Sequence, residues 1–305
     1  MAQISIIGTS EIVKEHIKVI LANKIRIFGI SSTRKKSKKL KNFKKNSYIK
    51  NIFEDWKECI KQTAKTKNCS LLIASRNKDT YKILKFALKY NIKIFTEKPV
   101  SDTVKNFKNL RKNYSNIFVG YNRTFYENII YLKKKLRKPN NVLVKCPENF
   151  LKDINLNSTH IISIIFYLFG KVRILKKIKN KNSIMVFGKS EKNIPICLLF
   201  SLKSSDNFSI EINENKRRYL LKPIEILKIY EKFKITYIRG RKKLKFVKPI
   251  LIKKISEFEQ NNFKPGFYKQ MKYFKNVFLN KKKNLKNNIL IAENIIQFSN
   301  QILKG

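Results

Sequence analysis

The chain has 305 residues, with 69 Lys and Arg against 20 Asp and Glu, and its formal net charge is +49. This length is long for one domain and comfortable for two. The charge would suit a polyanionic partner, but the lysines are spread along the whole chain and form no basic stripe interleaved with aromatic residues. We therefore favour a compositional bias toward Lys, Asn and Ile, and a nucleic-acid partner is not expected.

The four cysteines, Cys59, Cys69, Cys146 and Cys197, have no metal-ligand or redox spacing. With only two histidines in the chain, no metal site is expected. Reduced thiols fit a cytoplasmic protein best. The first eight residues lack the features of a signal peptide, and the longest apolar run, residues 161–169, is too short to span a bilayer. No membrane association is expected.

The first 121 residues alternate short apolar runs with helical patterns. Strands are predicted at residues 4–7, 25–30, 71–74, 92–96 and 117–119, and helices at residues 10–21, 79–90 and 102–113. Alternating strands and helices indicate βαβ units, a parallel sheet and right-handed crossovers. The sequence therefore predicts a doubly wound α/β domain.

A glycine turn separates the first strand from the first helix, which is where a dinucleotide pyrophosphate binds in such sheets. Gly8 holds the first glycine position, whereas Ser10 and Val13 stand where the second and third glycines would be. The Ser10 hydroxyl can still donate to a phosphate oxygen. An ordinary strand-to-helix turn is the alternative interpretation.

The second strand ends in Ser31-Ser32-Thr33-Arg34-Lys35-Lys36 rather than in an acidic residue. An acid at this place binds the ribose 2′-hydroxyl of NAD. Hydroxyls followed by Arg34 suit a 2′-phosphate better, so NADP is preferred over NAD. The alternative is that these cations form only a solvated basic face.

Residues 92–96 run into Glu97-Lys98-Pro99. Pro99 has no N–H for a strand ladder, and it moves Lys98 away from helical dihedrals. Lys98 is therefore expected at the mouth of a strand, where parallel sheets place their ligands. Considered alone, this stretch is more typical of a strand end with a solvated lysine.

Beyond residue 122, consecutive β-rich runs occur without intervening helices. They lie at residues 141–146, 172–178, 183–187, 196–202, 208–212, 219–221 and 235–238. This order predicts a mostly antiparallel sheet. Ser158 and Thr159 can cap a helix that carries His160, and helices at residues 267–279 and 285–302 close the chain.

Together these features resemble the glucose–fructose oxidoreductase/inositol dehydrogenase family (Gfo/Idh/MocA), of which the chain is identified as a divergent member. The segments that carry the resemblance, in order, are residues 6–16, 72–77, 97–99, 119–125, 159–160 with 167–170, and 266–274. Glu97-Lys98-Pro99 matches the most specific short motif of the family.

The resemblance implies an N-terminal Rossmann domain, residues 1–121, with a doubly wound parallel sheet. It implies a C-terminal α+β domain, residues 122–305, whose mostly antiparallel open sheet serves substrate binding and homo-oligomerisation as a dimer or tetramer. It leaves open that the C-terminal helix packs back on the first domain.

The resemblance also assigns site residues. Lys98, next to a typically cis peptide bond, and His160 are implied as catalytic and substrate-binding, with Asn122 and Arg123 on the substrate side. The expected cofactor-binding residues are Gly8, Thr9, Ser10, Glu11, Ile12, Ser32, Arg34, Ser75, Asn77, Glu97 and Lys98. Lys98 would bind the substrate hydroxyl and help manage its proton, and His160 would act as general base.

Several positions depart from the family pattern. Leu156 and Ser163 stand where aspartates orient the histidine in many members, Asp153 is a candidate substitute, and Tyr81 stands where a histidine often occurs. The leading hypothesis is an NAD(P)-dependent oxidoreductase that moves hydride between nicotinamide and a sugar, cyclitol or nucleotide-linked sugar. The alternative is a catalytically degenerate member that binds a nucleotide or metabolite as a regulatory or scaffold subunit.

Overall fold

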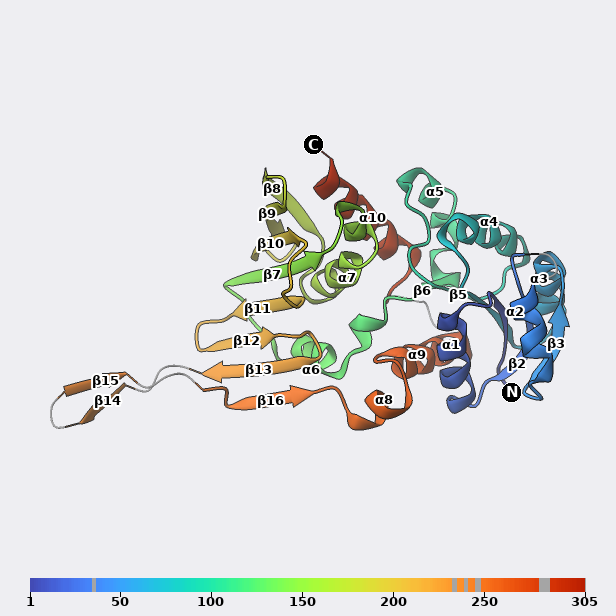
Figure 1. Ribbon diagram of the computed structural model, residues 1–305, viewed down its shortest axis with the longest axis horizontal. Helices are drawn as coiled ribbons and strands as arrows, with labels where there is room; N and C mark the ends of the chain where they lie inside the picture. Colours follow the sequence, from blue (N-terminus) through green and yellow to red (C-terminus); the bar gives the residue numbers. More distant parts are fainter. Residues whose placement is uncertain (35–36, 232–234, 239–240, 245–247, 280–285, 305) are drawn as a thin grey trace. The chain divides into compact units, whose positions relative to one another are not determined.

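The computed structural model describes residues 1–34, 37–231, 235–238, 241–244, 248–279 and 286–304 (Figure 1). The chain divides into two compact units. Unit 1 comprises Met1–Phe125 and Glu257–Gln297, and unit 2 comprises Tyr126–Ser256 and Phe298–Gly305. Unit 1 therefore takes its residues from two separate stretches of the sequence. The domain boundary drawn from the sequence at residues 121 and 122 stays a prediction.

Unit 1 is built on a six-stranded parallel sheet. Its strands are β1 (Gln3–Ile7), β2 (Arg26–Ser31), β3 (Ile49–Phe53), β4 (Cys69–Ile73), β5 (Ile94–Thr96) and β6 (Ile117–Val119). The spatial order is β3-β2-β1-β4-β5-β6, and each neighbouring pair is parallel. This is the doubly wound dinucleotide-binding order, so the predicted Rossmann fold is confirmed.

The longer helices of unit 1 bury apolar side chains in its core. The α-helices of this unit are α1 (Glu11–Ala22), α2 (Lys38–Lys41), α3 (Trp56–Lys65), α4 (Asn77–Ala87), α5 (Val104–Lys108), α8 (Glu257–Asn262) and α9 (Phe267–Leu279). Val13 and Ile17 of α1 share one buried cluster with Met271 and Phe274 of α9. Their helical spacing places each pair on one face, so α9 belongs to the core of unit 1.

Short 3₁₀ helices complete unit 1. They are η1 (Asn42–Lys45), η2 (Leu88–Tyr90), η3 (Arg111–Asn116) and η4 (Asn122–Phe125). The helix predicted at residues 102–113 is therefore wrong in its length, because α5 stops at Lys108 and a 3₁₀ segment follows. Helix α10 (Ile289–Leu303) begins in unit 1 and ends in unit 2.

Unit 2 contains an eight-stranded sheet. Its strands are β7 (Asn141–Glu148), β8 (Val172–Lys179), β9 (Ser183–Ser190), β10 (Pro195–Leu202), β11 (Ser209–Asn213), β12 (Arg217–Leu221), β13 (Ile226–Glu231) and β16 (Leu251–Lys254). The order is β16-β13-β12-β11-β7-β10-β9-β8. Only β7 and β10 pair in parallel, so the predicted mostly antiparallel sheet is confirmed.

Residues 235–238, predicted as a strand, form β14 (Ile235–Ile238) as expected. That strand pairs with β15 (Arg241–Leu244) in a separate two-stranded sheet. Residue 285, the first residue of the predicted last helix, lies outside the described residues.

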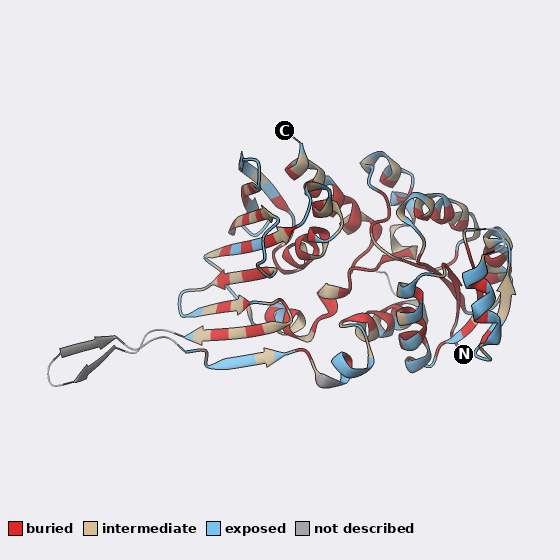
Figure 2. Ribbon diagram, viewed as in Figure 1, coloured by how far each residue is buried: buried red, intermediate tan, exposed pale blue. Residues whose placement is uncertain are grey.

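The two faces of the eight-stranded sheet differ. Residues alternate between buried and more exposed along β7, β9 and β10, as Figure 2 shows and as a sheet with one core face requires. The core face packs with η5 (Leu151–Asn155) and α7 (Ser158–Phe169), and α6 (Glu127–Lys135) packs against α7. The other face carries exposed apolar side chains, including Leu143 and Phe187. It has no covering element among the described residues of unit 2.

Among the described residues, none of the helices combines the length and the apolar character needed to cross a bilayer. The same residues bring together no group of three His, Cys, Asp or Glu side chains able to hold a metal ion. The four cysteines, all of them in the described part of the chain, form no disulfide bond.

Candidate functional site

The predicted cofactor-binding residues of unit 1 gather at one edge of the parallel sheet. Gly8, Ser32, Ser75 and Glu97 each follow within two residues of the end of β1, β2, β4 or β5. The register confirms the alignment, because Ile7 pairs with both Ser31 and Ile73, and Ile73 pairs with Thr96. The carboxyl ends of parallel strands form the ligand-binding edge of such folds.

Gly8 makes the close turn after β1. Its φ is +142°, and a Cβ at this position would lie 2.2 Å from the carbonyl oxygen of Ala74. The Gly8 N–H donates to Ser31 O at 2.9 Å. Only glycine fits this conformation and this contact. The first glycine of the fingerprint is therefore required by the fold.

The residues at the other two glycine positions differ in their surroundings. Ser10 is the exposed N-cap of α1, and its hydroxyl makes no capping bond to the helix. Val13 is fully buried in the core of unit 1. Val13 therefore packs where the third glycine normally allows close helix–strand contact. Ser10 keeps the N-terminus of α1 accessible, next to Thr9, Glu11 and Ile12.

The end of β2 presents hydroxyls and one arginine. Ser32 is buried, and its Oγ accepts a hydrogen bond from the Arg34 N–H at 3.2 Å. The Arg34 side chain is exposed. Among the described residues of this turn, 32–34, Arg34 carries a positive charge and none is acidic. Ser75 bonds Thr80 at 2.9 Å, and Asn77 opens α4.

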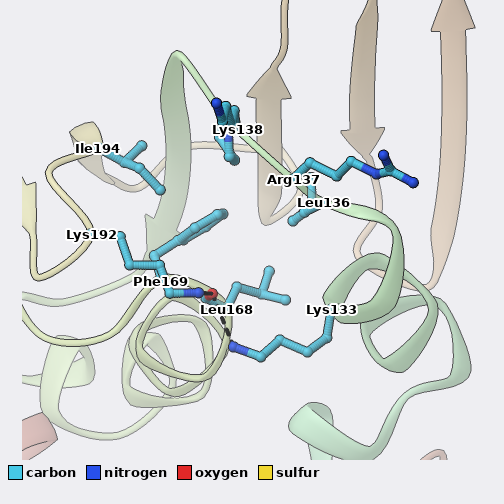
Figure 3. A pocket seen from close by; sticks show the side chains of 9 residues that line it. Lys133, Leu136, Arg137, Lys138, Leu168, Phe169, Lys192 and Ile194 are labelled. Carbon is cyan, nitrogen blue, oxygen red and sulfur yellow. Dashed lines mark hydrogen bonds between the residues drawn. The ribbon is translucent and has the colours of Figure 1, made fainter.

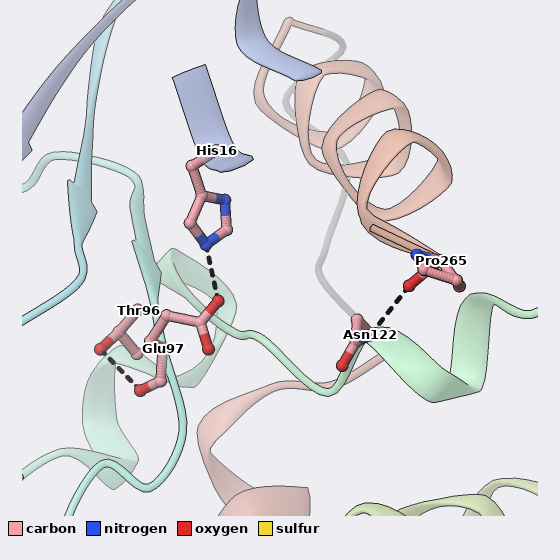
Figure 4. Close-up of polar contacts among 5 residues, drawn as sticks. All are labelled: His16, Thr96, Glu97, Asn122 and Pro265. Atoms are coloured by element: carbon pink, nitrogen blue, oxygen red, sulfur yellow. Dashed lines mark hydrogen bonds and ion pairs between the residues drawn. The ribbon is translucent and has the colours of Figure 1, made fainter. Parts of the chain in front are cut away.

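Glu97 follows β5 directly and is held on several sides. Its N–H donates to Ile73 O at 2.8 Å, which extends the β4–β5 pairing by one step. Its Oε1 lies 2.6 Å from Nε2 of His16 on α1 (Figure 4). The next peptide bond, Lys98–Pro99, is cis, as the resemblance implies. Lys98 itself is half-buried.

Asn122 and Arg123 lie in η4, directly after the turn that follows β6. Asn122 is buried, and its Nδ2 donates to Pro265 O at 2.9 Å (Figure 4). This bond ties η4 to the segment before α9. The turn is also fixed by Asn287, whose Nδ2 donates to Tyr121 O at 3.2 Å. Asn122 thus has a structural role, and its substrate-binding role stays a prediction, as does that of Arg123.

His160 belongs to unit 2 and is the third residue of α7. The imidazole is partly exposed, and the His160 carbonyl accepts from the Ser163 hydroxyl at 2.6 Å. Asp153, the candidate substitute for the missing aspartate, accepts the Phe150 N–H at 3.1 Å and closes the first turn of η5. The substitution of Asp153 for the missing aspartate stays a hypothesis.

Glu148 is a carboxylate near the start of α7 that the sequence did not single out. It ends β7 and is buried. It accepts hydrogen bonds from the Ser158 hydroxyl and from Asn157 Nδ2, the latter at 3.1 Å. Burial raises the pKa of Glu148, while these two donors act in the opposite direction. In the sequence, the one available indication was a glutamate near the end of a predicted strand. Its partners Asn157 and Ser158 lie 9 and 10 residues further along the chain and form no recognisable motif with it.

Glu148 also lines a polar cavity of about 300 Å³. The other residues around this cavity are Pro147, Asn149, Asn157, Ser204, Asp206, Asn207 and Phe208. Asp206 forms ion pairs with Lys222 at 2.8 Å and Lys145 at 3.6 Å. The cavity therefore combines one buried carboxylate with several amides near the N-terminus of the helix that carries His160.

A second cavity, of about 220 Å³, lies at the other end of α7 (Figure 3). Lys133 donates to Tyr167 O at 2.6 Å and to Leu168 O at 3.1 Å, and Lys192 donates to Leu168 O at 3.3 Å. Burial lowers the pKa of Lys133, and the neighbouring Lys192 adds to this effect. These ammonium groups satisfy the last carbonyls of α7 and its dipole, which accounts for the cations at this cavity.

The strand order and the glycine turn define unit 1 as a dinucleotide-binding domain of the Rossmann class. Residues 2–116 match the family model described as "Oxidoreductase family, NAD-binding Rossmann fold" (GFO_IDH_MocA). This match within unit 1 agrees with the resemblance to the glucose–fructose oxidoreductase/inositol dehydrogenase family that the sequence motifs indicated. No curated protein matches the sequence.

Solved structures share the fold of nearly the whole chain at low identity. A dehydrogenase (MviM) from Clostridium difficile has a TM-score of 0.74 at 18% identity, covering 99% of this chain and 97% of that chain. The UDP-N-acetylglucosamine 3-dehydrogenase GnnA from Acidithiobacillus ferrooxidans has a TM-score of 0.73 at 12% identity, covering 98% and 96%. A super-repressor mutant of Gal80p from Saccharomyces cerevisiae also has a TM-score of 0.73 at 12% identity, covering 99% and 94%.

Proposed function

We propose that this protein is an NAD(P)-dependent oxidoreductase acting on a CH–OH group of a sugar, cyclitol or nucleotide-linked sugar. The observation that carries the proposal is the position of Glu97-Lys98-Pro99. The cis Lys98–Pro99 bond follows β5 at the same sheet edge as the Gly8 turn. Gly8 supports a dinucleotide there, because it makes the tight turn after β1 in which a Cβ would clash with the Ala74 carbonyl.

The nicotinamide would supply the hydride acceptor or donor. The residues of this chain would bind, orient and move a proton. Gly8 to Ile12 and the N-terminus of α1 would hold the pyrophosphate, and Ser75 and Asn77 would line the dinucleotide. Lys98 would donate to the reacting oxygen of the substrate. His160 would accept the hydroxyl proton as general base, with Asn122 and Arg123 on the substrate side.

NADP is the preferred cofactor. Ser32 and Arg34 follow β2 where an NAD-selective site has an acid. The exposed guanidinium of Arg34 can pair with a 2′-phosphate bidentately. A nucleotide-linked sugar is supported by the likeness in fold to GnnA, which is described as a UDP-N-acetylglucosamine dehydrogenase.

We further propose that the protein is a homodimer or homotetramer that assembles through the open face of the eight-stranded sheet. Leu143 is 47% exposed and Phe187 is 37% exposed on that face. Leu143 and Phe187 are both register neighbours of Cys197, so they form one continuous apolar area. Exposed apolar areas of this kind are typical of association surfaces. The four cysteines, none of them in a disulfide bond, favour a reducing, cytoplasmic location.

The test is a titration of NADPH and NADH by nicotinamide fluorescence, followed by turnover assays with a panel of sugars, cyclitols and nucleotide-linked sugars. Lys98→Ala should abolish turnover while the protein stays folded. Lys105→Ala changes an exposed lysine of α5 in the same unit and serves as the matched control. If Lys98→Ala retains wild-type turnover, the proposed mechanism is wrong, and if neither dinucleotide binds, the proposed function is wrong.

A second candidate is a catalytically degenerate member that binds a nucleotide or metabolite as a regulatory or scaffold subunit. The buried Val13 at a glycine position supports it, as do Leu156 and Ser163 at positions where many family members have aspartates. The fold likeness to a Gal80p super-repressor mutant is compatible with it. Tight dinucleotide binding without turnover across the whole panel would favour this candidate over the enzyme.

A further inference from the structure

His16 is an unusual residue for its position in the core of unit 1. It lies on the buried face of α1 and has no exposed surface. Its ring meets Phe95 edge-on at 5.2 Å and lies 4.8 Å from the ring of Phe267. A leucine or phenylalanine would suit these neighbours equally well. The position therefore holds a polar side chain inside aromatic surroundings, which calls for a polar partner.

That partner is Glu97. His16 Nε2 lies 2.6 Å from Glu97 Oε1 (Figure 4), and the two residues are 81 positions apart in the chain. The other ring nitrogen, His16 Nδ1, is buried and has no hydrogen-bond partner among the described residues. Glu97 is thus the one polar group that the structure describes within hydrogen-bonding reach of this imidazole.

The pattern of partners indicates how the imidazole is protonated. A carboxylate oxygen can only accept, so the hydrogen sits on Nε2 and is donated to Glu97. A proton on Nδ1 would be buried among aromatic rings without an acceptor, which is unfavourable. The arrangement therefore favours the neutral tautomer with Nε2–H. Such a bond to an ionised carboxylate is short and strong, in agreement with the observed distance.

Glu97 is confined from the other side by Gly120. A Cβ on Gly120 would lie 3.0 Å from Glu97 Oε1 and 3.2 Å from Oε2. The Gly120 N–H donates to Thr96 O at 2.8 Å, and the Glu97 N–H donates to Ile73 O at 2.8 Å. The carboxylate is thereby held between an imidazole and a glycine backbone, while its main chain continues the sheet. These contacts fix the backbone immediately before Lys98.

We propose that His16 is a positioning residue for Lys98. Its Nε2–H orients the Glu97 carboxylate, and this contact holds the Lys98–Pro99 segment at the dinucleotide edge of the sheet. His16 stands on α1, the helix whose N-terminus faces the pyrophosphate in the proposed function. One rigid helix therefore joins the phosphate-binding turn to the segment that carries the reacting lysine. This inference rests on the proposed function for the role of Lys98.

The chain contains only two histidines, His16 and His160, which makes the contact directly measurable by NMR. Protein labelled with ¹⁵N-histidine should give two imidazole systems, and His160→Gln identifies the one that belongs to His16. We expect His16 as the neutral Nε2–H tautomer, with a slowly exchanging ring N–H. Glu97→Gln keeps an acceptor but removes its charge, so the Nε2–H proton should move upfield. An Nδ1–H tautomer would overturn the inference, and so would an Nε2–H chemical shift that is the same in Glu97→Gln and in the wild type.

Two substitutions separate positioning from packing. His16→Leu fills the apolar site without a donor, whereas His16→Gln retains an amide N–H at a similar reach. With the proposed activity present, His16→Leu should lower kcat on the order of tenfold to a hundredfold, with little change in the KM for NADPH. His16→Gln should recover most of that loss. Equal kcat for the wild type and His16→Leu would contradict the positioning role.

A readout that needs no activity keeps this inference distinct from the proposed function. In hydrogen-exchange mass spectrometry, peptides covering residues 94–101 of His16→Leu should exchange about tenfold faster than in the wild type. Peptides from β9 in unit 2 are the internal control and should not change. If the wild type shows no turnover, the proposed function fails while the exchange result still decides the contact. Unchanged exchange at residues 94–101 would contradict the positioning role of His16 and would leave the proposed function unaffected.

Discussion

The backbone of Gly8 lies directly against the carbonyl group of Ala74. A Cβ at Gly8 would be 2.2 Å from Ala74 O and 2.8 Å from Ala74 C. The Ala74 N–H donates to Ile7 O at 2.9 Å, so neither strand end can move away without losing a ladder bond. The close approach of β1 and β4 at this edge therefore depends on the absence of a side chain at residue 8.

Gly8→Ala is accordingly predicted to be severely destabilising. The residue combines a φ of +142° with a backbone clash, and such strain costs about 3 kcal/mol or more. Urea unfolding monitored by circular dichroism should show the loss. Gly29→Ala is the control, because Gly29 has no positive φ and its Cβ would clash with the side chain of Phe53, while the backbone oxygen of Asn51 would lie at an ordinary contact distance of 3.5 Å. An unchanged unfolding midpoint for Gly8→Ala would contradict the predicted strain.

Much of unit 1 could be predicted because its strands are short apolar runs in a fixed order with helices. The edge strand β3 was missed, together with α3. In β3 only Ile49 is buried, so the apolar signal of an edge strand is weak among the surrounding lysines and asparagines. In unit 2, β13 and β16 were missed, and Leu251 and Ile252 of β16 are exposed.

The candidate site was predictable only where its residues are contiguous. Glu97-Lys98-Pro99 can be recognised in the sequence as a motif, whereas the contact between Glu97 and His16 joins residues 81 positions apart. The same holds for Glu148, whose partners Asn157 and Ser158 are supplied by the start of α7. Buried polar pairs depend on the three-dimensional packing of elements, and one sequence carries no local periodicity that reports them.

Arg34 is predicted to discriminate between the two dinucleotides. Arg34→Gln should weaken NADPH binding about tenfold, since a charged hydrogen bond to the 2′-phosphate is lost, and should leave NADH binding nearly unchanged. Fluorescence titration at constant salt measures both dissociation constants. Arg26→Gln is the matched control, because Arg26 is exposed at the opposite end of the same strand β2. Equal losses for both variants would show that only general positive charge matters.

The four thiols should differ strongly in reactivity. Burial raises the pKa of Cys59 to about 12 and that of Cys69 to about 11, and Cys146 has no exposed surface. Cys197 is partly exposed on the open sheet face. Because the thiolate is the reactive form, one thiol should react with an aromatic disulfide reagent near neutral pH in dilute native protein. Rapid reaction of all four without denaturant would contradict the described packing.

Cys197 also reports on the proposed assembly. Leu143 is its register neighbour on β7, so association through this face should slow the labelling of Cys197 as the protein concentration rises. Leu143→Lys places a charge in the apolar area and should abolish that protection and reduce the mass seen by light scattering. Lys179→Ala, at the end of the edge strand β8, is the control. Concentration-independent labelling together with a stable oligomer would place the interface elsewhere.

Glu148→Gln should make the protein more stable at neutral pH than at acid pH, relative to the wild type. Burial raises the pKa of Glu148 in the folded protein above its ordinary value of 4.5. The stabilisation that this group contributes is therefore complete below that ordinary value, and it is lost as the pH rises through the folded pKa. The amide in the Glu148→Gln variant does not titrate, and it still offers an oxygen to Ser158.

The difference in Tm between Glu148→Gln and the wild type should thus grow from about pH 4 to about pH 7, measured by scanning calorimetry. Ser158→Ala is the control in which the pH dependence of stability should change in the opposite direction. The Ser158 hydroxyl lowers the pKa of Glu148, so its removal should make the stability of the otherwise wild-type protein fall more steeply with pH. A Tm difference that stays constant across this range would mean that Glu148 titrates as it does in the unfolded chain, and that its burial carries no electrostatic cost at the start of the helix that bears His160.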